Sequence, residues 1–138
     1  MEPYTDAHLR ILVNIVNNVD LEIPITLAIP GGILTGNLIG FGLWATRVAD
    51  AMKPADKDGF YPYTDYLRVQ ALALKEGNNL DPSESDATHE EEPRFIHVGN
   101  VRFVGGEGVV PLGKGLIWRG KLSDVSGWAF GSMEPAAK

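Results

Sequence analysis

Cysteine is absent from this 138-residue chain, and positive charge and long apolar runs are scarce. Without cysteine there is no disulfide, no thiolate metal ligand and no cysteine nucleophile, which agrees with a reducing cytoplasm. The formal net charge of −6 repels phosphate backbones. We therefore expect a cytoplasmic protein that does not bind nucleic acid through its bulk charge.

The sequence also lacks the patterns of a membrane helix and of a signal peptide. Its most hydrophobic stretch, residues 23–49, contains Pro24, Pro30, Arg47 and five glycines. A spanning helix needs about 20 consecutive apolar residues, so these interruptions favour strands and turns instead. The first residues have neither the basic region nor the apolar run of a signal peptide. We expect no membrane association.

The residues that are present describe one small β-rich domain covering residues 1–138. The length suits a single core, and Gly 16 with Pro 9 indicates short strands and tight turns. We predict a mainly β fold with helices (α+β), in which an N-terminal helix precedes an Sm-like or SH3-like five-stranded barrel. The predicted segments are the helix 8–18, the barrel halves 23–48 and 94–130, an insertion 53–93 and a frayed tail 131–138.

Periodicity supports the first predicted segments. Apolar residues spaced at i, i+3, i+4 and i+7 within residues 9–16 predict a helix, with Thr5 or Asp6 as its cap. Residues 25–29 alternate, Pro30-Gly31-Gly32 supplies a turn, and residues 33–41 resume a strand, which together predict a hairpin. Glycine inside that second strand, Gly36, marks a bulge or bend.

The insertion and the second half follow different patterns. A helix ending near Gly77 and then a flexible acidic loop over residues 78–92 are predicted for the insertion. In the second half we predict strands over 94–104, 116–122 and 128–130, a bulge or turn at Gly99-Asn100, and pairing of the last two strands. The residues expected on one face of the insertion helix are Tyr63, Tyr66, Leu67, Gln70, Ala71 and Leu74.

Catalytic chemistry has little support in the sequence. The histidines, His8, His89 and His97, do not lie beside a recognisable nucleophile motif. His89 and the following residues 90–92 could hold a cation, but consecutive residues of a flexible loop converge poorly on a metal ion. The glycines of residues 105–108 lack the spacing of a phosphate-binding loop. We predict no enzyme activity, no cofactor and no metal.

The candidate interaction residues all belong to the second barrel half. Its basic side chains could bind an anion, although the acidic loop offers them partners as well. Its tryptophans, with Trp44, could form a stacking platform for bases, but their apolar surroundings favour packing in a core or an interface. The residues are Arg94, Arg102, Trp118, Arg119, Lys121 and Trp128.

Two families share patterns with these segments. Residues 25–39, in which Gly31 precedes Gly36 by five positions, and Ile117-Trp118-Arg119-Gly120 resemble the two halves of an Sm-like barrel. Sm-like proteins that bind RNA place an acidic residue after the second strand, where this chain has Gly42-Leu43-Trp44-Ala45. This resemblance therefore implies the fold and not RNA binding.

The closer resemblance is to the gas vesicle accessory protein U family of bacteria. It rests on Gly32-Ile33-Leu34-Thr35-Gly36, on residues 95–103 and especially on residues 116–131, which include Ile117-Trp118-Arg119-Gly120-Lys121. The resemblance implies a non-catalytic accessory role in gas vesicle assembly or organisation. Its partners would be proteins, including gas vesicle components.

The sequence leaves two other functions open. Small barrels expose edge strands, and pairing of such edges between subunits leads us to expect a homo-oligomer. One alternative function is an Sm-like nucleic-acid-binding module, which would need a local positive or aromatic surface. The second is a small-molecule sensor that uses a cavity between the 63–74 helix and the barrel.

Overall fold

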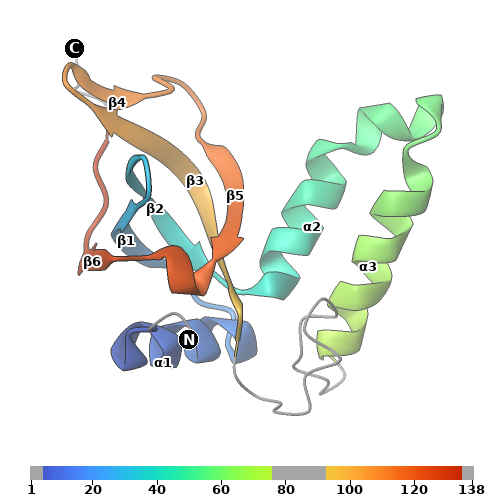
Figure 1. Ribbon diagram of the computed structural model, residues 1–138. Coiled ribbons are helices and arrows are strands. Elements are labelled where there is room, and N and C mark those ends of the chain that lie inside the picture. Colours follow the sequence, from blue (N-terminus) through green and yellow to red (C-terminus); the bar gives the residue numbers. More distant parts are fainter. Residues whose placement is uncertain (1–4, 76–92, 135–138) are drawn as a thin grey trace.

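A computed structural model describes residues 5–75 and 93–134 of the protein. It confirms a mainly β, α+β fold, with one curved sheet, helix α1 at one end of it and a helical hairpin at its side (Figure 1). The elements are α1 (Ala7–Asn18), β1 (Ile23–Ile29), β2 (Gly32–Ile39), α2 (Phe41–Ala51), η1 (Lys53–Asp58), α3 (Tyr61–Lys75), β3 (Phe95–Gly105), β4 (Gly108–Val110), β5 (Leu116–Lys121), η3 (Leu122–Asp124) and β6 (Gly127–Phe130).

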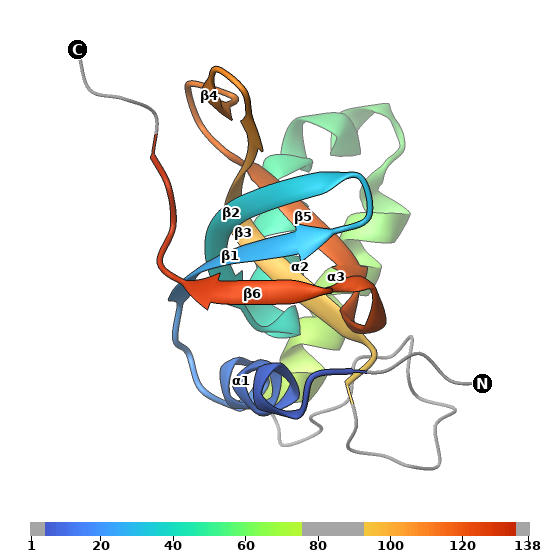
Figure 2. The same ribbon diagram turned by 60° about the vertical axis from the view of Figure 1, so that its left-hand side comes forward.

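The sheet is antiparallel, with strand order β4-β3-β2-β1-β6 and with β5 paired to β3 (Figure 2). It has six strands where five were expected, because the short β4 adds a hairpin to the end of β3. The predicted pairing of β5 with β6 was wrong. The single turn of η3 carries the chain to the far side of the sheet, where the Ser126 amide donates to the Ala28 carbonyl at 2.9 Å. Within the described residues no ladder joins β5 to β6, so the sheet is not closed.

Two irregularities curve the central strands, as the sequence predicted. The pairing of β2 with β3 shifts between Thr35 and Asn37, beside Gly36. A Cβ placed on Gly36 would lie 2.6 Å from the carbonyl oxygen of Gly99, so only glycine allows this approach. Asn100 has a φ of 53°, a conformation that asparagine tolerates better than most residues.

The main core fills the concave side of the sheet and is covered by α1. The predicted helix is present, and the carboxylate of Asp6 caps it by accepting from the Leu9 amide at 3.0 Å, which holds the pKa of Asp6 below its ordinary value. Its buried stripe packs against the strands, whereas Ile11 and Ile15 are exposed. The buried core residues are Leu9, Val13, Val16, Ile25, Leu27, Leu34, Leu38, Ile96, Val98, Val101, Leu122 and Val125.

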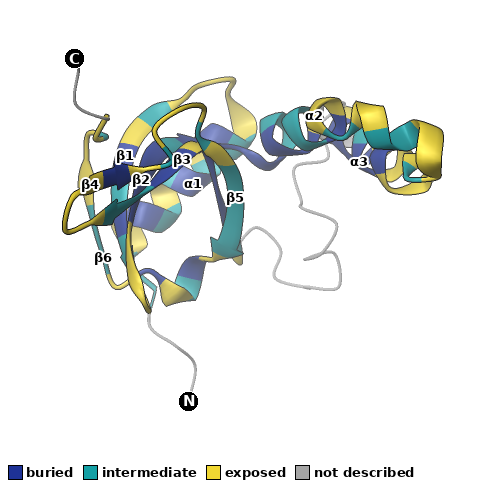
Figure 3. Ribbon diagram, turned by 90° about the horizontal axis from the view of Figure 1, so that it is seen from above, coloured by how far each residue is buried: buried dark blue, intermediate teal, exposed yellow. Residues whose placement is uncertain are grey.

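The first sheet half ends at Ile39, earlier than the predicted boundary at residue 48. Residues from Phe41 form α2. The Asn17 side chain accepts from the Phe41 amide at 2.9 Å at the start of this helix. The preceding Gly40 passes so close to the Val16 carbonyl that a Cβ there would clash. The insertion therefore begins at α2 instead of residue 53. It stands away from the sheet (Figure 3) and has its own core of Ile39, Phe41, Trp44, Ala45, Leu67 and Ala71.

The residues predicted to share one face of this helix differ in burial within α3. Leu67, Gln70 and Ala71 are buried, but Tyr63 and Tyr66 are exposed. Thr64, which was not among the predicted residues, is also buried. Its hydroxyl donates to the Asp56 carboxylate of η1 at 2.9 Å. The side chain of Leu74 and the predicted acidic loop 78–92 lie outside the described residues.

Residues 131–134, the described part of the predicted tail, run from β6 across β1 and β2 toward β3. The Gly131 amide donates to the Pro24 carbonyl at 2.9 Å, and the Met133 amide donates to the Thr35 hydroxyl at 2.7 Å. Glu134 then reaches the Arg102 guanidinium, with 3.8 Å between charged atoms. This part of the chain is attached to the outer face of the sheet.

Candidate functional site

Arg102 is buried at the outer face of the sheet and holds the loop after β4. Its side chain is almost fully buried, and it donates to the carbonyls of Pro111 at 3.1 Å and Gly113 at 2.6 Å. Asn100, on the same strand, accepts from the Gly115 amide at 3.2 Å. These bonds give Arg102 a structural role at the β4 end of β3.

Arg119 also makes its main contacts within the chain. Its guanidinium carbon lies 4.0 Å from the ring centroid of Phe95 and 5.4 Å from that of Trp44, which are cation–π distances. Because Phe95 starts β3 and Trp44 lies on α2, Arg119 joins the sheet to the helical hairpin. Sequence reasoning missed this junction, since α2 was not predicted.

His97 lies opposite Arg119 in the β3–β5 ladder and is 2% exposed. Its ring contacts the rings of Trp44 at 5.0 Å and Phe41 at 5.5 Å between centroids. Burial, and then the nearby charge of Arg119, lower the pKa of His97 to about 3. His97 is therefore neutral at neutral pH and packs as an aromatic ring between sheet and hairpin.

The tryptophans do not form a common stacking platform. Trp44 is buried in the hairpin core, while Trp118 and Trp128 pack against the sheet core. The Trp118 indole lies over Gly120, where a Cβ would come within 2.3 Å of it. Trp128 meets Phe130 edge to face, with ring centroids 5.2 Å apart. All three tryptophans pack against apolar residues of the two cores, which the sequence analysis favoured over a stacking platform.

The remaining basic candidates are exposed at the end of the sheet opposite Arg102. Arg94 comes just before β3, and its carbonyl accepts from the Leu122 amide at 2.9 Å. Lys121 pairs with Phe95 at the end of β5. The predicted positive cluster is thus divided between the two ends of β3, with Arg119 stacked on aromatic rings.

Two exposed apolar surfaces were missed by the sequence analysis. On the side of α3 away from α2 lie Tyr66, Val69 and Leu72, of which Val69 is 66% exposed. On the loop braced by Arg102, Leu112 is 74% exposed. The sequence of α3 already indicates an exposed apolar surface, because apolar residues occupy a wider part of the helix circumference than one packed face requires.

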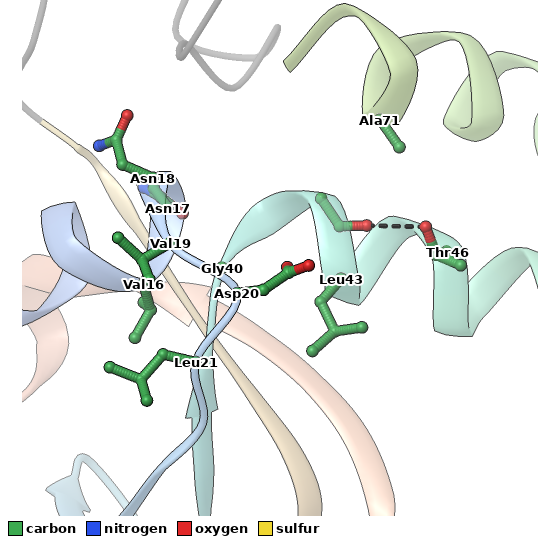
Figure 4. A pocket seen from close by; sticks show the side chains of 11 residues that line it. Val16, Asn17, Asn18, Val19, Asp20, Leu21, Gly40, Leu43, Thr46 and Ala71 are labelled. Atoms are coloured by element: carbon green, nitrogen blue, oxygen red, sulfur yellow. Dashed lines mark hydrogen bonds between the residues drawn. The ribbon is translucent and has the colours of Figure 1, made fainter. Parts of the chain in front are cut away.

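A pocket of about 360 Å³ lies where α1, α2 and α3 meet (Figure 4). The end of α1 and the linker to β1 form one wall, and the first turns of α2 form the other. Its lining residues are Val16, Asn17, Asn18, Val19, Asp20, Leu21, Gly40, Gly42, Leu43, Thr46 and Ala71. The small-molecule alternative invoked a cavity between the 63–74 helix and the barrel. This pocket lies instead mainly between α1 and α2, and Ala71 of α3 is among its described lining residues.

Residues 5–75 and 93–134 contain no group of three or more histidine and acidic side chains that could hold a metal ion. In the same part of the chain, no helix has the length and hydrophobicity to cross a membrane. His89 and the acidic residues 90–92 lie outside the described residues.

These features define a small mainly β domain with an inserted helical hairpin and exposed apolar surfaces. The sequence matches the family described as gas vesicle protein GvpU-like over residues 6–133, and the chain belongs to that family. It is therefore a gas-vesicle-related protein, of a family that is not a known enzyme family. No curated protein and no solved structure matches the chain.

Proposed function

We propose that this protein is a non-catalytic accessory protein of gas vesicle assembly or organisation, acting in the cytoplasm through protein–protein contacts. Family membership supports the link to gas vesicles. The apolar outer face of α3, formed by Tyr66, Val69 and Leu72, is the observation that supports contact with a protein. Nothing in the arrangement of the basic and aromatic candidates favours the nucleic-acid alternative.

The outer face of α3 has the chemistry of a protein interface. Tyrosine and aliphatic side chains are common at the centres of interfaces, where they bury apolar area at low entropic cost. Asp65 lies one turn before Val69 and pairs with Arg68 at 3.3 Å, so charged side chains adjoin the apolar ones on this helix. Exposed apolar patches bordered by polar residues are typical of surfaces that bind another protein.

The sheet edges support self-association as part of this function. Among the described strands, β6 pairs only with β1 and β5 pairs only with β3. Both strands therefore present an outer edge of backbone donors and acceptors. A strand from a second copy can pair with such an edge, which agrees with the expected homo-oligomer.

The test is co-flotation of the purified full chain with gas vesicles isolated from cells. We expect Val69→Ser with Leu72→Ser to reduce the bound fraction about tenfold, because truncating apolar anchors at an interface costs more than about 1 kcal/mol. Both side chains are exposed, so the free energy of unfolding should change by less than about 0.5 kcal/mol for each.

The matched control is Ile11→Ser with Ile15→Ser on α1, which removes the same kind of exposed apolar surface from another helix. It should leave co-flotation unchanged. Wild-type flotation of the α3 variant would contradict the proposed interface. Equal loss in both variants would show that general hydrophobicity, and not α3, causes the binding.

A further inference from the structure

The pocket between α1 and α2 has an electronegative wall. Helix α1 ends at Asn18 without a basic residue in its last turn, although cations are favoured at helix C-termini. Only three residues of chain then separate Asn18 from Glu22, and one of them is Asp20, whose carboxyl group points toward the α2 side of the pocket (Figure 4). The carbonyl end of α1 and one carboxylate thus face the same space.

The guanidinium of Arg47 does not neutralise this wall. Arg47 of α2 is not a lining residue, and its guanidinium pairs with Glu22 at 2.7 Å. Among the residues that the structure describes, the lining includes no lysine, arginine or histidine, and Asp20 is its one acidic residue. An anion at the start of α2 would meet this carboxylate unfavourably.

Apolar side chains also line the pocket. Leu43 of α2 lies beside Asp20, the exposed side chains of Val19 and Leu21 border the pocket from the linker, and Ala71 lies beyond them on α3 (Figure 4). Two polar lining residues already hydrogen-bond within the protein. The Thr46 hydroxyl donates to the Gly42 carbonyl at 3.0 Å, and the Asn17 side chain accepts from the Phe41 amide at the start of α2. A volume of about 360 Å³ lies in the range of small-ligand sites.

We infer that this pocket binds an aliphatic chain ending in an ammonium group, held by Asp20 and the carbonyl end of α1. A lysine side chain of a partner protein and a free alkylamine share this chemistry. The hydrocarbon stem lies against Val19, Leu21 and Leu43, and the ammonium group replaces the missing basic residue of the last turn of α1. The inference does not depend on the outer face of α3.

The test is an NMR titration of the ¹⁵N-labelled full chain with two probes at low salt. One is n-pentylammonium, and the other is a five-residue peptide with one central lysine, four alanines and blocked ends. We expect saturable shifts at the amides of Asn18, Asp20 and Leu43. Tighter binding of the peptide would identify a partner's lysine as the ligand, and tighter binding of the amine would identify a free alkylamine.

Two variants separate the site from general attraction to an acidic protein. Asp20→Asn should weaken binding of both probes about fivefold, the effect of one partly exposed charge pair. Asp50→Asn, an exposed acid of α2 outside the pocket, should leave it unchanged. n-Pentanol, which has the stem without the charge, should bind about fivefold more weakly than the amine.

Several results would overturn the inference. Shifts spread over the acidic surface, or equal weakening by both variants, would show unspecific attraction. Equal binding of n-pentanol and n-pentylammonium would show that Asp20 and α1 contribute nothing. Absence of saturable shifts with either probe would exclude the site.

Discussion

His97 is a titratable side chain that the fold removes from water, so the stability of the protein depends on pH through it. In the folded protein its pKa is about 3, whereas an exposed histidine titrates near 6.5. Between these values the unfolded chain binds a proton that the folded protein excludes. The free energy of unfolding therefore falls as the pH drops from 6.5 toward 3.

The corresponding prediction concerns His97→Phe, which keeps an aromatic ring beside Phe41 and Trp44. Between pH 7.5 and pH 5.0 the wild type should lose about 2 kcal/mol more stability than this variant. Histidine in the unfolded chain titrates near 6.5, and each of the roughly 1.5 pH units below that value contributes about 1.4 kcal/mol. Urea unfolding at both pH values measures the difference. An equal dependence on pH in His97→Phe would contradict the argument.

Sequence reasoning predicted residues whose role is local and missed those that depend on distant packing. The Asp6 cap and the bend at Gly36 follow from neighbours along the chain, and both were predicted. Arg102 and Arg119 were predicted as interaction residues. Their observed partners are the carbonyls of the loop after β4 and the rings of Phe95 and Trp44, which only the folded chain brings to them.

At the scale of elements, the curvature of β2 and β3 depends on their close approach at Gly36. Gly36→Ala should destabilise the protein by at least about 2 kcal/mol, because the added methyl group meets a backbone oxygen that cannot rotate away. Gly32→Ala, in the same strand with open space around it, should change stability by less than about 1 kcal/mol. Urea unfolding of both variants measures this, and equal effects would contradict it.

Helix α2 could have been predicted, whereas the partner of β6 could not. Phe41, Trp44, Ala45 and Ala49 follow the helical spacing i, i+3, i+4 and i+8, and this signal was overlooked because the preceding strand is equally apolar. The choice of β1 over β5 as the neighbour of β6 depends on the path of the chain through η3. No periodicity within β6 encodes that choice.

At the scale of the whole molecule, residues 131–134 connect the end of the described chain to three strands. Thr35 is fully buried beneath this segment, and its hydroxyl accepts from the Met133 amide and lies 2.9 Å from the Thr26 hydroxyl. Strands β1 and β2 are thus bonded through the same pair of threonines to a segment about 100 residues later. These bonds attach the end of the described chain to the middle of the sheet.

Thr35→Val should therefore release residues 131–134 from the sheet. We expect a loss of about 1 to 2 kcal/mol and faster hydrogen exchange at the Met133 amide, because the valine cannot accept its hydrogen bond. Thr46→Val is the control, since that exposed hydroxyl bonds only within α2. Unchanged exchange at Met133 in Thr35→Val would contradict the attachment.

The helical hairpin leaves the sheet at the end of β2, and the chain returns at the start of β3. The hairpin stands apart from the sheet (Figure 3) and has its own core, to which β2 contributes Ile39. It also contacts the sheet at His97 and Arg119. Mutations that lengthen, shorten or repattern the outer part of α2 and α3 leave the strand ladders and the main core untouched. The outer face of α3, on which the proposed protein contact depends, can therefore be altered without loss of the sheet.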